Sequence, residues 1–274
     1  TPNARLGAMT VTHGCISRSV RDTARWFDVA NGRDPAEPLS LPRVEGWEAG
    51  LGTHLDELRG RRVAVVPDWG SAVVSPAMWE LLEEAADLLI ADCGMVRVDG
   101  VDTALPRMGA AWSVANSVEL LEALGPYWPE CADQLTPEIR LAMEAAAGKY
   151  GAEARWKLER RRSELDAAMA RIFDTAAGGV DFVMTATNPD VAFAAEGPLP
   201  DTFGGIQAGA QINGRLTFPA NLHGNPAISV PAGFLDGLPV GLQIVAPHFH
   251  EELLLDLALT VERKRPWPLT VNGV

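Results

Sequence analysis

The chain has 274 residues, of which 47% are hydrophobic, and its formal net charge is −13 at pH 7. This length and apolar content suffice to bury a full core, in one large domain or two small ones. The strong negative charge argues against nucleic acid or an anionic membrane surface as a partner. Every apolar run is far shorter than the about 20 residues of a membrane-spanning helix, so we expect no membrane partner.

The cysteines and the first residue bear on the setting of the protein. Cys15, Cys93 and Cys131 are odd in number, widely spaced and free of any C-x-x-C pattern. This usage fits a reduced, cytoplasmic setting better than a disulfide framework. The chain starts at Thr1, without Met and without a signal-peptide pattern. We therefore expect it to begin inside a longer gene product or to have been trimmed.

The first predicted helix lies within residues 9–28, after a short loop. Ser17 or Ser19 is the expected N-cap, and Arg18 and Asp22 are spaced for an i,i+4 ion pair. Residues 34–59 are rich in Pro, Gly and charged residues, which predicts a surface connection.

Residues 60–107 predict a strand–helix–strand unit. The run 62–67 (RVAVVP) is typical of a buried strand, and the helix after it should begin with Ser75 as N-cap and end at Gly94. Its expected apolar face consists of Leu81, Leu82, Ala85, Leu88 and Leu89, and a second strand should begin at Met95. No G-x-G-x-x-G joins strand to helix, so this is not a dinucleotide-binding fingerprint.

Residues 108–177 predict a mostly helical layer. An apolar stripe at helical spacing runs through Leu158, Leu165, Met169, Ile172 and Phe173. Four basic side chains lie mainly off that stripe: Lys157, Arg160, Arg161 and Arg162. A solvated face explains this basic cluster better than a phosphate or partner site, given the net charge of −13.

Residues 178–264 predict the sheet core, the loops around it and a closing helix. A short strand is expected at 181–186 and a long loop at 194–215, and the helix should span 251–263. Two apolar runs, 227–231 and 240–246, flank an Asp236-Gly237 turn signal and predict paired strands covered on both faces.

Three amides in this region have predicted roles. Gln243 lies inside the second apolar run, so its side chain should tie two backbone segments together. Asn221 and Asn225, each close to a proline, are expected to be rigid turn residues.

No stretch of the sequence builds a catalytic centre by itself. The G-x-S-x-G of elbow-type hydrolases is absent, and Ser229 lies in an apolar run where its hydroxyl should bond to backbone. His248 and His250 are two residues apart, whereas a zincin pair is four apart on a helix. Cys15 has no implied His partner. We therefore assign no catalytic residue, no metal ligand and no cofactor.

The segment 217–243 carries a family resemblance. It reads TFPANLHGNPAISVPAGFLDGLPVGLQ and resembles the C-terminal signature of the amidase signature family. The matching structural positions are Asn221, Gly224, Pro226, Pro231, Gly233, Gly241 and Gln243. The pattern Gly14-x-x-x-Arg18-Ser19-Val20-x-Asp22-x-Ala24 is similar to the segment that follows the family's catalytic core. The resemblance implies an α/β fold: a mixed, mostly buried β-sheet flanked by helices, with residues 1–274 as the C-terminal portion of one domain.

The same resemblance implies amide hydrolysis through an acyl-enzyme. Family members use a Ser–Ser–Lys triad, with a neutral lysine as base and backbone N–H groups as oxyanion hole. Those groups belong upstream of Gly14, whereas the first lysine of this chain is Lys149. None of the triad is carried over, and we expect the chain alone to be inactive and the full-length protein to be an amidase.

The resemblance also places part of the substrate pocket in this chain. Family members carry a strand followed by a Thr/Pro loop close to the substrate, which makes residues 185–189 a pocket wall. The pocket candidates are Trp112, Thr185, Phe193, Phe203, Thr217 and Phe218. Core packing is the alternative explanation for each of them.

Two alternatives to a broad amidase stay open. One is the glutaminase subunit of a tRNA-dependent amidotransferase, which usually carries an Asp where this chain has Gly214. The other is a non-catalytic binding or structural module of the same fold. The expected partners are a small-molecule amide and either the missing N-terminal segment or a second copy of the chain.

Overall fold

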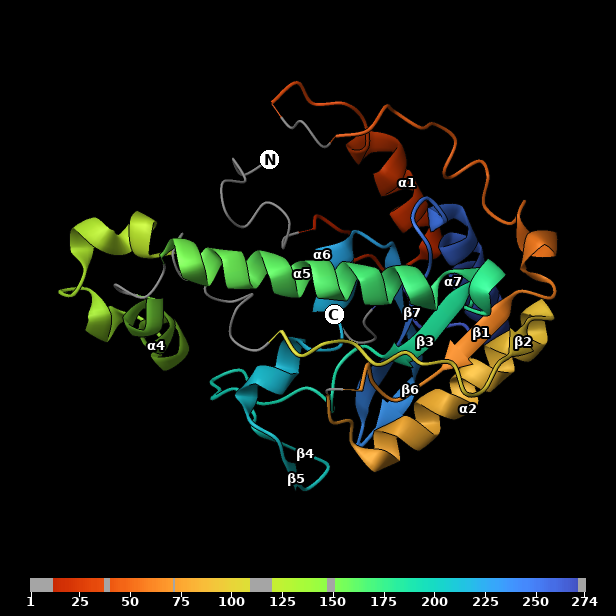
Figure 1. The fold of residues 1–274 in the computed structure, drawn as a ribbon. Coiled ribbons are helices and arrows are strands. Elements are labelled where there is room, and N and C mark those ends of the chain that lie inside the picture. The colour runs from red at the N-terminus through yellow and green to blue at the C-terminus, as the bar shows by residue number, and fades with distance from the viewer. Residues whose placement is uncertain (1–11, 37–39, 71, 109–119, 147–150, 271–274) are drawn as a thin grey trace.

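A computed structural model describes residues 12–36, 40–70, 72–108, 120–146 and 151–270. Its main feature is a five-stranded mixed sheet with the order β2-β1-β3-β7-β6 (Figure 1). The strands are β1 (Arg62–Val65), β2 (Val96–Arg97), β3 (Phe182–Ala186), β6 (Ala227–Leu235) and β7 (Leu238–Val245). β1 pairs parallel with β2 and β3, whereas β7 pairs antiparallel with β3 and β6. The predicted α/β class with a mixed sheet is confirmed.

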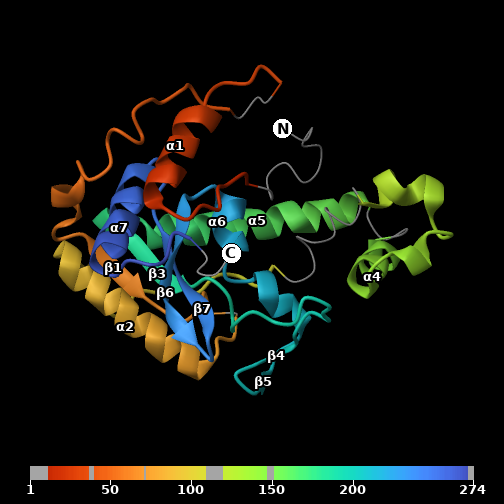
Figure 2. The same cartoon turned by 180° about the vertical axis from the view of Figure 1, so that it is seen from behind.

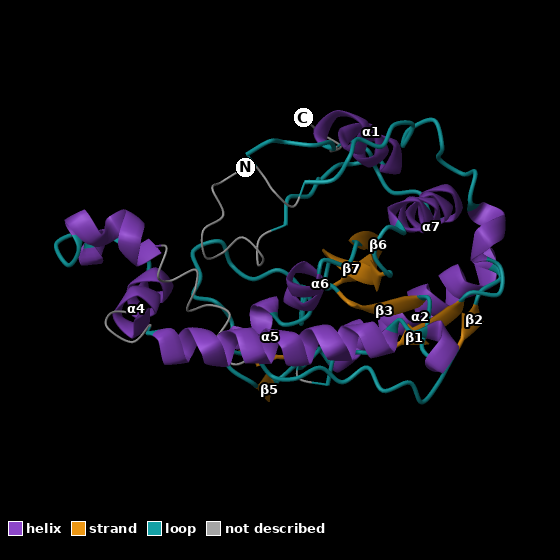
Figure 3. Cartoon of the chain, turned by 45° about the horizontal axis from the view of Figure 1, so that its top comes forward, coloured by secondary structure: helices purple, strands orange, loops and turns teal. Residues whose placement is uncertain are grey.

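Helices cover both faces of this sheet. The α-helices with described bounds are α1 (Val20–Ala30), α2 (Pro76–Cys93), α4 (Pro137–Ala146), α5 (Ala152–Ile172), α6 (Phe218–His223) and α7 (Glu251–Lys264). α2 and α7 contact each other and strand β6, and α5 crosses the opposite face (Figures 1 and 2). α4 lies beyond the far end of α5, away from the sheet (Figure 3). None of the helices in the described ranges has the length and apolar content needed to span a bilayer.

The β6–β7 hairpin forms where the Asp-Gly signal predicts it. Asp236 and Gly237 both have positive φ, 52° and 77°, which is the backbone of a type I′ turn. A register shift between Pro231 and Gly233 marks a bulge in β6, and Gly233 adopts a φ of 136° there.

The two hairpin strands differ in burial, and one prediction about them is wrong. β7 is buried over most of its length, as expected for a strand paired on both sides. β6 is largely exposed or half-buried, and Val230 is its one buried residue. β6 is the outermost strand of the sheet, so apolar composition alone could not show that its outer edge would lack a neighbour.

The helix predictions are mostly confirmed. α2 begins after Ser75, as predicted, although the Ser75 side chain makes no capping hydrogen bond. Pro76 lies in its first turn, and the helix ends at Gly94, whose φ is 65°. Its buried residues are Met78, Leu82, Ala86, Leu89 and Ile90. The face toward the core is therefore rotated from the predicted one, and Leu88 is 46% exposed. Ser19 caps α1, but the guanidinium of Arg18 donates to the Leu269 carbonyl and forms no ion pair with Asp22.

Two short segments differ from their predictions. Residues 194–215, predicted as loop, contain a small hairpin of β4 (Thr202–Phe203) and β5 (Ile206–Gln207). Gly204 and Gly205 make its turn, with φ of 53° and 81°. Asn221, predicted in a turn, lies inside α6, because the Pro at the helix start and Gly224 at its end make this short stretch a complete helical turn.

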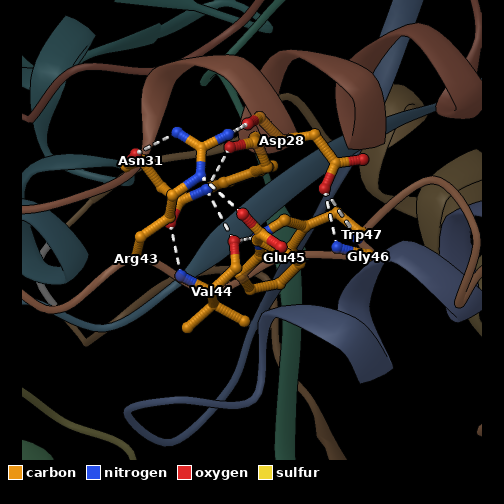
Figure 4. A network of polar contacts seen from close by, with 8 residues as sticks. Asp28, Asn31, Arg43, Val44, Glu45, Gly46 and Trp47 are labelled. Atoms are coloured by element: carbon orange, nitrogen blue, oxygen red, sulfur yellow. Dashed lines mark hydrogen bonds and ion pairs between the residues drawn. The ribbon is translucent and has the colours of Figure 1, made fainter.

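The connection after α1 is held to that helix by side chains at the helix's C-terminal end, Asp28 in the last turn and the C-cap residue Asn31 (Figure 4). Asp28 accepts N–H bonds from Gly46, Trp47 and Glu48, each 2.9 Å long. Asn31 exchanges two hydrogen bonds with the backbone of Val44, at 2.8 and 2.9 Å. These bonds satisfy backbone groups in a segment without helix or strand, and the Glu48 N–H in particular lowers the pKa of the Asp28 carboxyl.

The Asp28 contacts give a testable prediction. In Asp28→Asn, the charge and one acceptor are lost, so amides 46–48 should exchange with solvent faster than in the wild type. Because the folded pKa is lowered, the wild-type contact stabilises the fold above the unfolded value of about 3.9 and is lost as pH falls through the folded pKa. Hydrogen exchange from pH 6 to 3 measures both effects. Asp22→Asn, at the other end of α1, is the control, and equal exchange in both variants would contradict the assignment.

Candidate functional site

The signature segment runs from α6 into β6 and borders a groove. The groove encloses about 610 Å³ between residues 12–20, the outer strand β6 and helix α7. Four of the seven signature positions line it: Asn221, Gly224, Pro226 and Pro231. The N-terminal side of the groove includes Gly14 and Arg18, the first two residues of the second family-like pattern. Both motifs therefore meet at one place, although about 200 residues separate them in the sequence.

A buried polar network lies on β7, the strand that pairs with the groove-lining strand β6. The Gln243 side-chain amide donates to the Leu216 carbonyl at 2.9 Å, and the Trp69 indole N–H donates to the same oxygen at 3.0 Å. Gln243 thus ties β7 to the segment that leads into α6, as predicted. Burying a side-chain amide inside an apolar sheet costs little free energy when the amide is hydrogen-bonded in this way.

A hydroxyl pair lies on the exposed part of the same sheet. Ser229 Oγ on β6 is 2.6 Å from Thr187 Oγ1, which follows β3. The prediction that the Ser229 hydroxyl bonds to backbone is wrong, because the Ser229 side chain points toward Thr187 and its hydroxyl pairs with the Thr187 hydroxyl. Gly241 leaves the space for this pair: a Cβ there would lie 2.5 Å from Ser229 Oγ and 3.0 Å from Thr187 Oγ1.

The predicted pocket residues do not gather at the groove. Thr185 and Phe203 are buried, at 0% and 1% exposure, and the Thr185 hydroxyl donates to the Pro67 carbonyl. Phe193 is 49% exposed, and Thr217 and Phe218 are half-buried at the start of α6. None of these five lines the groove, and Trp112 lies outside the described residues. Their role toward a substrate stays a prediction.

Two titratable groups near the groove have shifted pKa values. Burial raises the pKa of the Glu251 carboxyl, which lines the groove at the start of α7. Burial lowers the pKa of His223, which packs edge-on against His248 with ring centres 4.8 Å apart. In the described ranges, no three His, Cys, Asp or Glu side chains come close enough together to hold a metal ion.

Sequence reasoning missed the groove, Glu251 and the contact between Thr187 and Ser229. In the sequence, Glu251 is an ordinary acidic residue in the first turn of a helix, where the helix dipole favours it. Its contribution to the groove depends on how α7 packs on β6, which local patterns do not encode.

Comparison with known proteins decides the family. The family model described as Amidase matches residues 2–255. The chain belongs to the amidase signature family. Among curated relatives it is 31% identical to an acylamidase of Rhodococcus erythropolis, over 93% of this chain and 52% of that protein. It is 28% identical to the A-type subunit of the glutamyl-tRNA(Gln) amidotransferase of Rhodospirillum rubrum, over 91% of this chain and 52% of the relative.

Amidase signature enzymes of known structure share the fold. A bacterial aryl acylamidase superimposes with a TM-score of 0.78 at 23% identity, over 93% of this chain and 53% of that one. A 6-aminohexanoate cyclic dimer hydrolase does so with a TM-score of 0.65 at 25% identity, over 91% and 54%. The chain spans about half the length of the relatives it matches.

The close approach at Gly241 gives a prediction for this amidase family member. Gly241→Ala would push a methyl group into the Ser229 and Thr187 hydroxyls, so it should lower the free energy of unfolding by about 1–3 kcal/mol. Ser229→Ala alone should stay within about 0.5 kcal/mol, as for most surface changes. In the double variant the Ser229 hydroxyl is gone and the methyl group at position 241 has space, so much of the lost unfolding free energy should be recovered. Urea unfolding of the four proteins measures this coupling, and additive effects would refute the steric explanation.

Proposed function

We propose that this chain forms the signature-bearing half of an amide hydrolase. The observation that carries the proposal is the family match over residues 2–255, together with the two family motifs that both line one groove. The relative named acylamidase supports amides as the substrate class. The reaction is attack on a carboxamide carbonyl, departure of the amine from an acyl-enzyme, and release of the acid by water.

The reactive groups are proposed to come from outside these 274 residues. A serine nucleophile needs a base, and Ser229 contacts only another hydroxyl among the hydrogen bonds of the described residues. Lys157 and Lys264 are more than half exposed and lie near Glu153 and Asp92, so neither is the buried, neutral lysine that a Ser–Ser–Lys triad uses. In this proposal the chain supplies the sheet, the groove wall and substrate contacts.

A second candidate function is that of an amidotransferase glutaminase subunit. Several curated relatives have that name, and their identity to this chain, 24–28% in two examples, is slightly below that of the acylamidase. Gly214 ends a short 3₁₀ helix just before α6 and brings no carboxylate to this region. We therefore favour an amidase with broader acyl selection over a glutamine-specific enzyme.

The test of the proposed function compares two proteins on one substrate panel. The 274-residue chain alone should leave aliphatic amides, aryl amides and glutamine unhydrolysed above the background rate. The complete gene product should hydrolyse at least one carboxamide, with ammonia or amine release as the readout. Preference for glutamine over every simple amide would favour the glutaminase alternative. Hydrolysis by the 274-residue chain alone, or no hydrolysis by either protein, would contradict the proposal.

A further inference from the structure

The C-terminal end of α6 is held by an imidazole from a distant part of the chain. His223 is the last residue of α6, and His248 Nε2 lies 2.9 Å from its carbonyl oxygen. Because a carbonyl can only accept, the Nε2–H of His248 is the donor, and it satisfies one of the carbonyls that a helix end leaves without a partner. The two rings also pack edge-on, with their planes at 74°. His248 therefore fastens the turn at residues 247–250, between β7 and α7, to α6.

The turn that His248 fastens has an unfavourable backbone conformation. Phe249 has a φ of 64°, in a region that residues other than glycine rarely adopt, and its side chain is exposed. The Nδ1–H of His250 donates to the His248 carbonyl across this turn, at 2.9 Å. Glu251 follows as the first residue of α7 and lines the groove, as does Gly224, which follows α6. A rearrangement of the turn would therefore displace residues of the groove.

The ring of His223 has two alternative partners. One is the ring of His248, and the other is the Asp166 carboxylate of α5, whose Oδ1 lies 3.7 Å from His223 Nδ1. That distance is too long for a hydrogen bond, so Asp166 becomes a strong partner only for a charged imidazole that moves closer to it. The His223 side chain is 16% exposed and that of Asp166 is 43% exposed. A ring that moves toward Asp166 therefore moves toward solvent as well.

Protonation decides between these two partners. The charged and titratable groups around the two histidines are Asp166 and Arg162 on α5, His248 and His250 in the turn, and Glu251 on α7. Burial is the main reason that the pKa of His223 is lowered; Asp166 acts in the opposite sense, whereas His248 and Arg162 add to the lowering. Because the folded pKa is lowered, the packed arrangement is most stable above the unfolded value of about 6.5 and loses stability as the pH falls below it.

We propose that His223 and His248 form a pH-sensitive latch between α6 and the turn at residues 247–250. In the closed state His223 is neutral, its ring packs on His248, and the turn is held against the helix. When His223 gains a proton, its ring leaves His248 and pairs with Asp166, and the turn is released. Release changes the groove at Gly224 and Glu251 as the medium becomes acidic. The latch does not depend on the proposed hydrolysis, because neither histidine lines the groove.

Hydrogen exchange of the complete gene product tests the latch. The Gly224 and Asn225 amides both donate to the Ala220 carbonyl, and their protection, corrected for the intrinsic exchange rate, should fall several-fold between pH 7.5 and pH 5. The Gly94 amide, at the end of α2, is the internal control and should change little. In His223→Phe, which keeps a flat ring that cannot gain a proton, the fall should disappear. No fall in the wild type, or an equal fall in His223→Phe, would overturn the proposal.

Charge neutralisation on α5 tests the second partner of the ring. Asp166→Asn removes the charge that favours a protonated His223, so the midpoint of the exchange profile should move to lower pH. Glu164→Gln is the matched control, because it neutralises a carboxylate of the same helix that pairs with Arg160 and Arg161 instead. An unmoved midpoint in Asp166→Asn, or an equal shift in both variants, would contradict the change of partner.

A measurement on the wild type alone decides the outcome if His223→Phe does not fold. In the complete gene product labelled with ¹³C-histidine, nuclear Overhauser contacts between the rings of His223 and His248 should be present at pH 7.5 and absent at pH 5. Contacts that persist at pH 5 would refute the latch. None of these readouts uses activity, so the latch can succeed or fail separately from the proposed hydrolysis.

Discussion

The pairing of β7 with strands on both of its sides is the interaction on which the rest of the structure depends. It joins β3, which belongs to the parallel part of the sheet, to β6, which carries the signature. Gln243 on β7 extends the same connection to the segment before α6. Without β7, the groove would lose its wall, because α7 packs on the hairpin that β6 and β7 form together. A hairpin closed by Asp236 and Gly237 therefore positions most of the candidate site.

The described residues form a folded scaffold with a groove but do not assemble a catalytic centre. They give a well-packed core, ordered motifs and a groove. Ser229 contacts another hydroxyl and Lys157 and Lys264 lie beside surface carboxylates, so these three are not assembled for nucleophilic attack. An acyl-transfer centre needs a nucleophile, a base and oxyanion donors within hydrogen-bond reach of one another. We infer that the other half of the domain contributes those groups and that this half contributes the surface against which they are held.

Sequence patterns predict where the helices and strands lie better than they predict which neighbours those elements contact and how deeply they are buried. Pro76, Gly94 and the Asp-Gly turn act through local backbone geometry, so the ends of α2 and the hairpin could be predicted directly. The exposure of β6 and the rotated face of α2 depend on which neighbour each element meets, and composition does not contain that information. The predicted pocket residues share only an aromatic or hydroxylated side chain, and residue type alone could not show that Thr185 and Phe203 are fully buried. Asn225 and Glu251 line the groove only because of how α6, β6 and α7 pack together, which local sequence patterns do not encode.

The proposal that the reactive groups lie outside these 274 residues is tested most directly by mass spectrometry after treatment with a fluorophosphonate, which phosphonylates activated serines. We predict that the 274-residue chain keeps its unmodified mass under conditions in which the complete gene product gains one adduct. Peptide mapping should place that adduct outside residues 1–274. A stoichiometric adduct on a serine of this chain, Ser229 above all, would show that it holds its own nucleophile and would contradict the division.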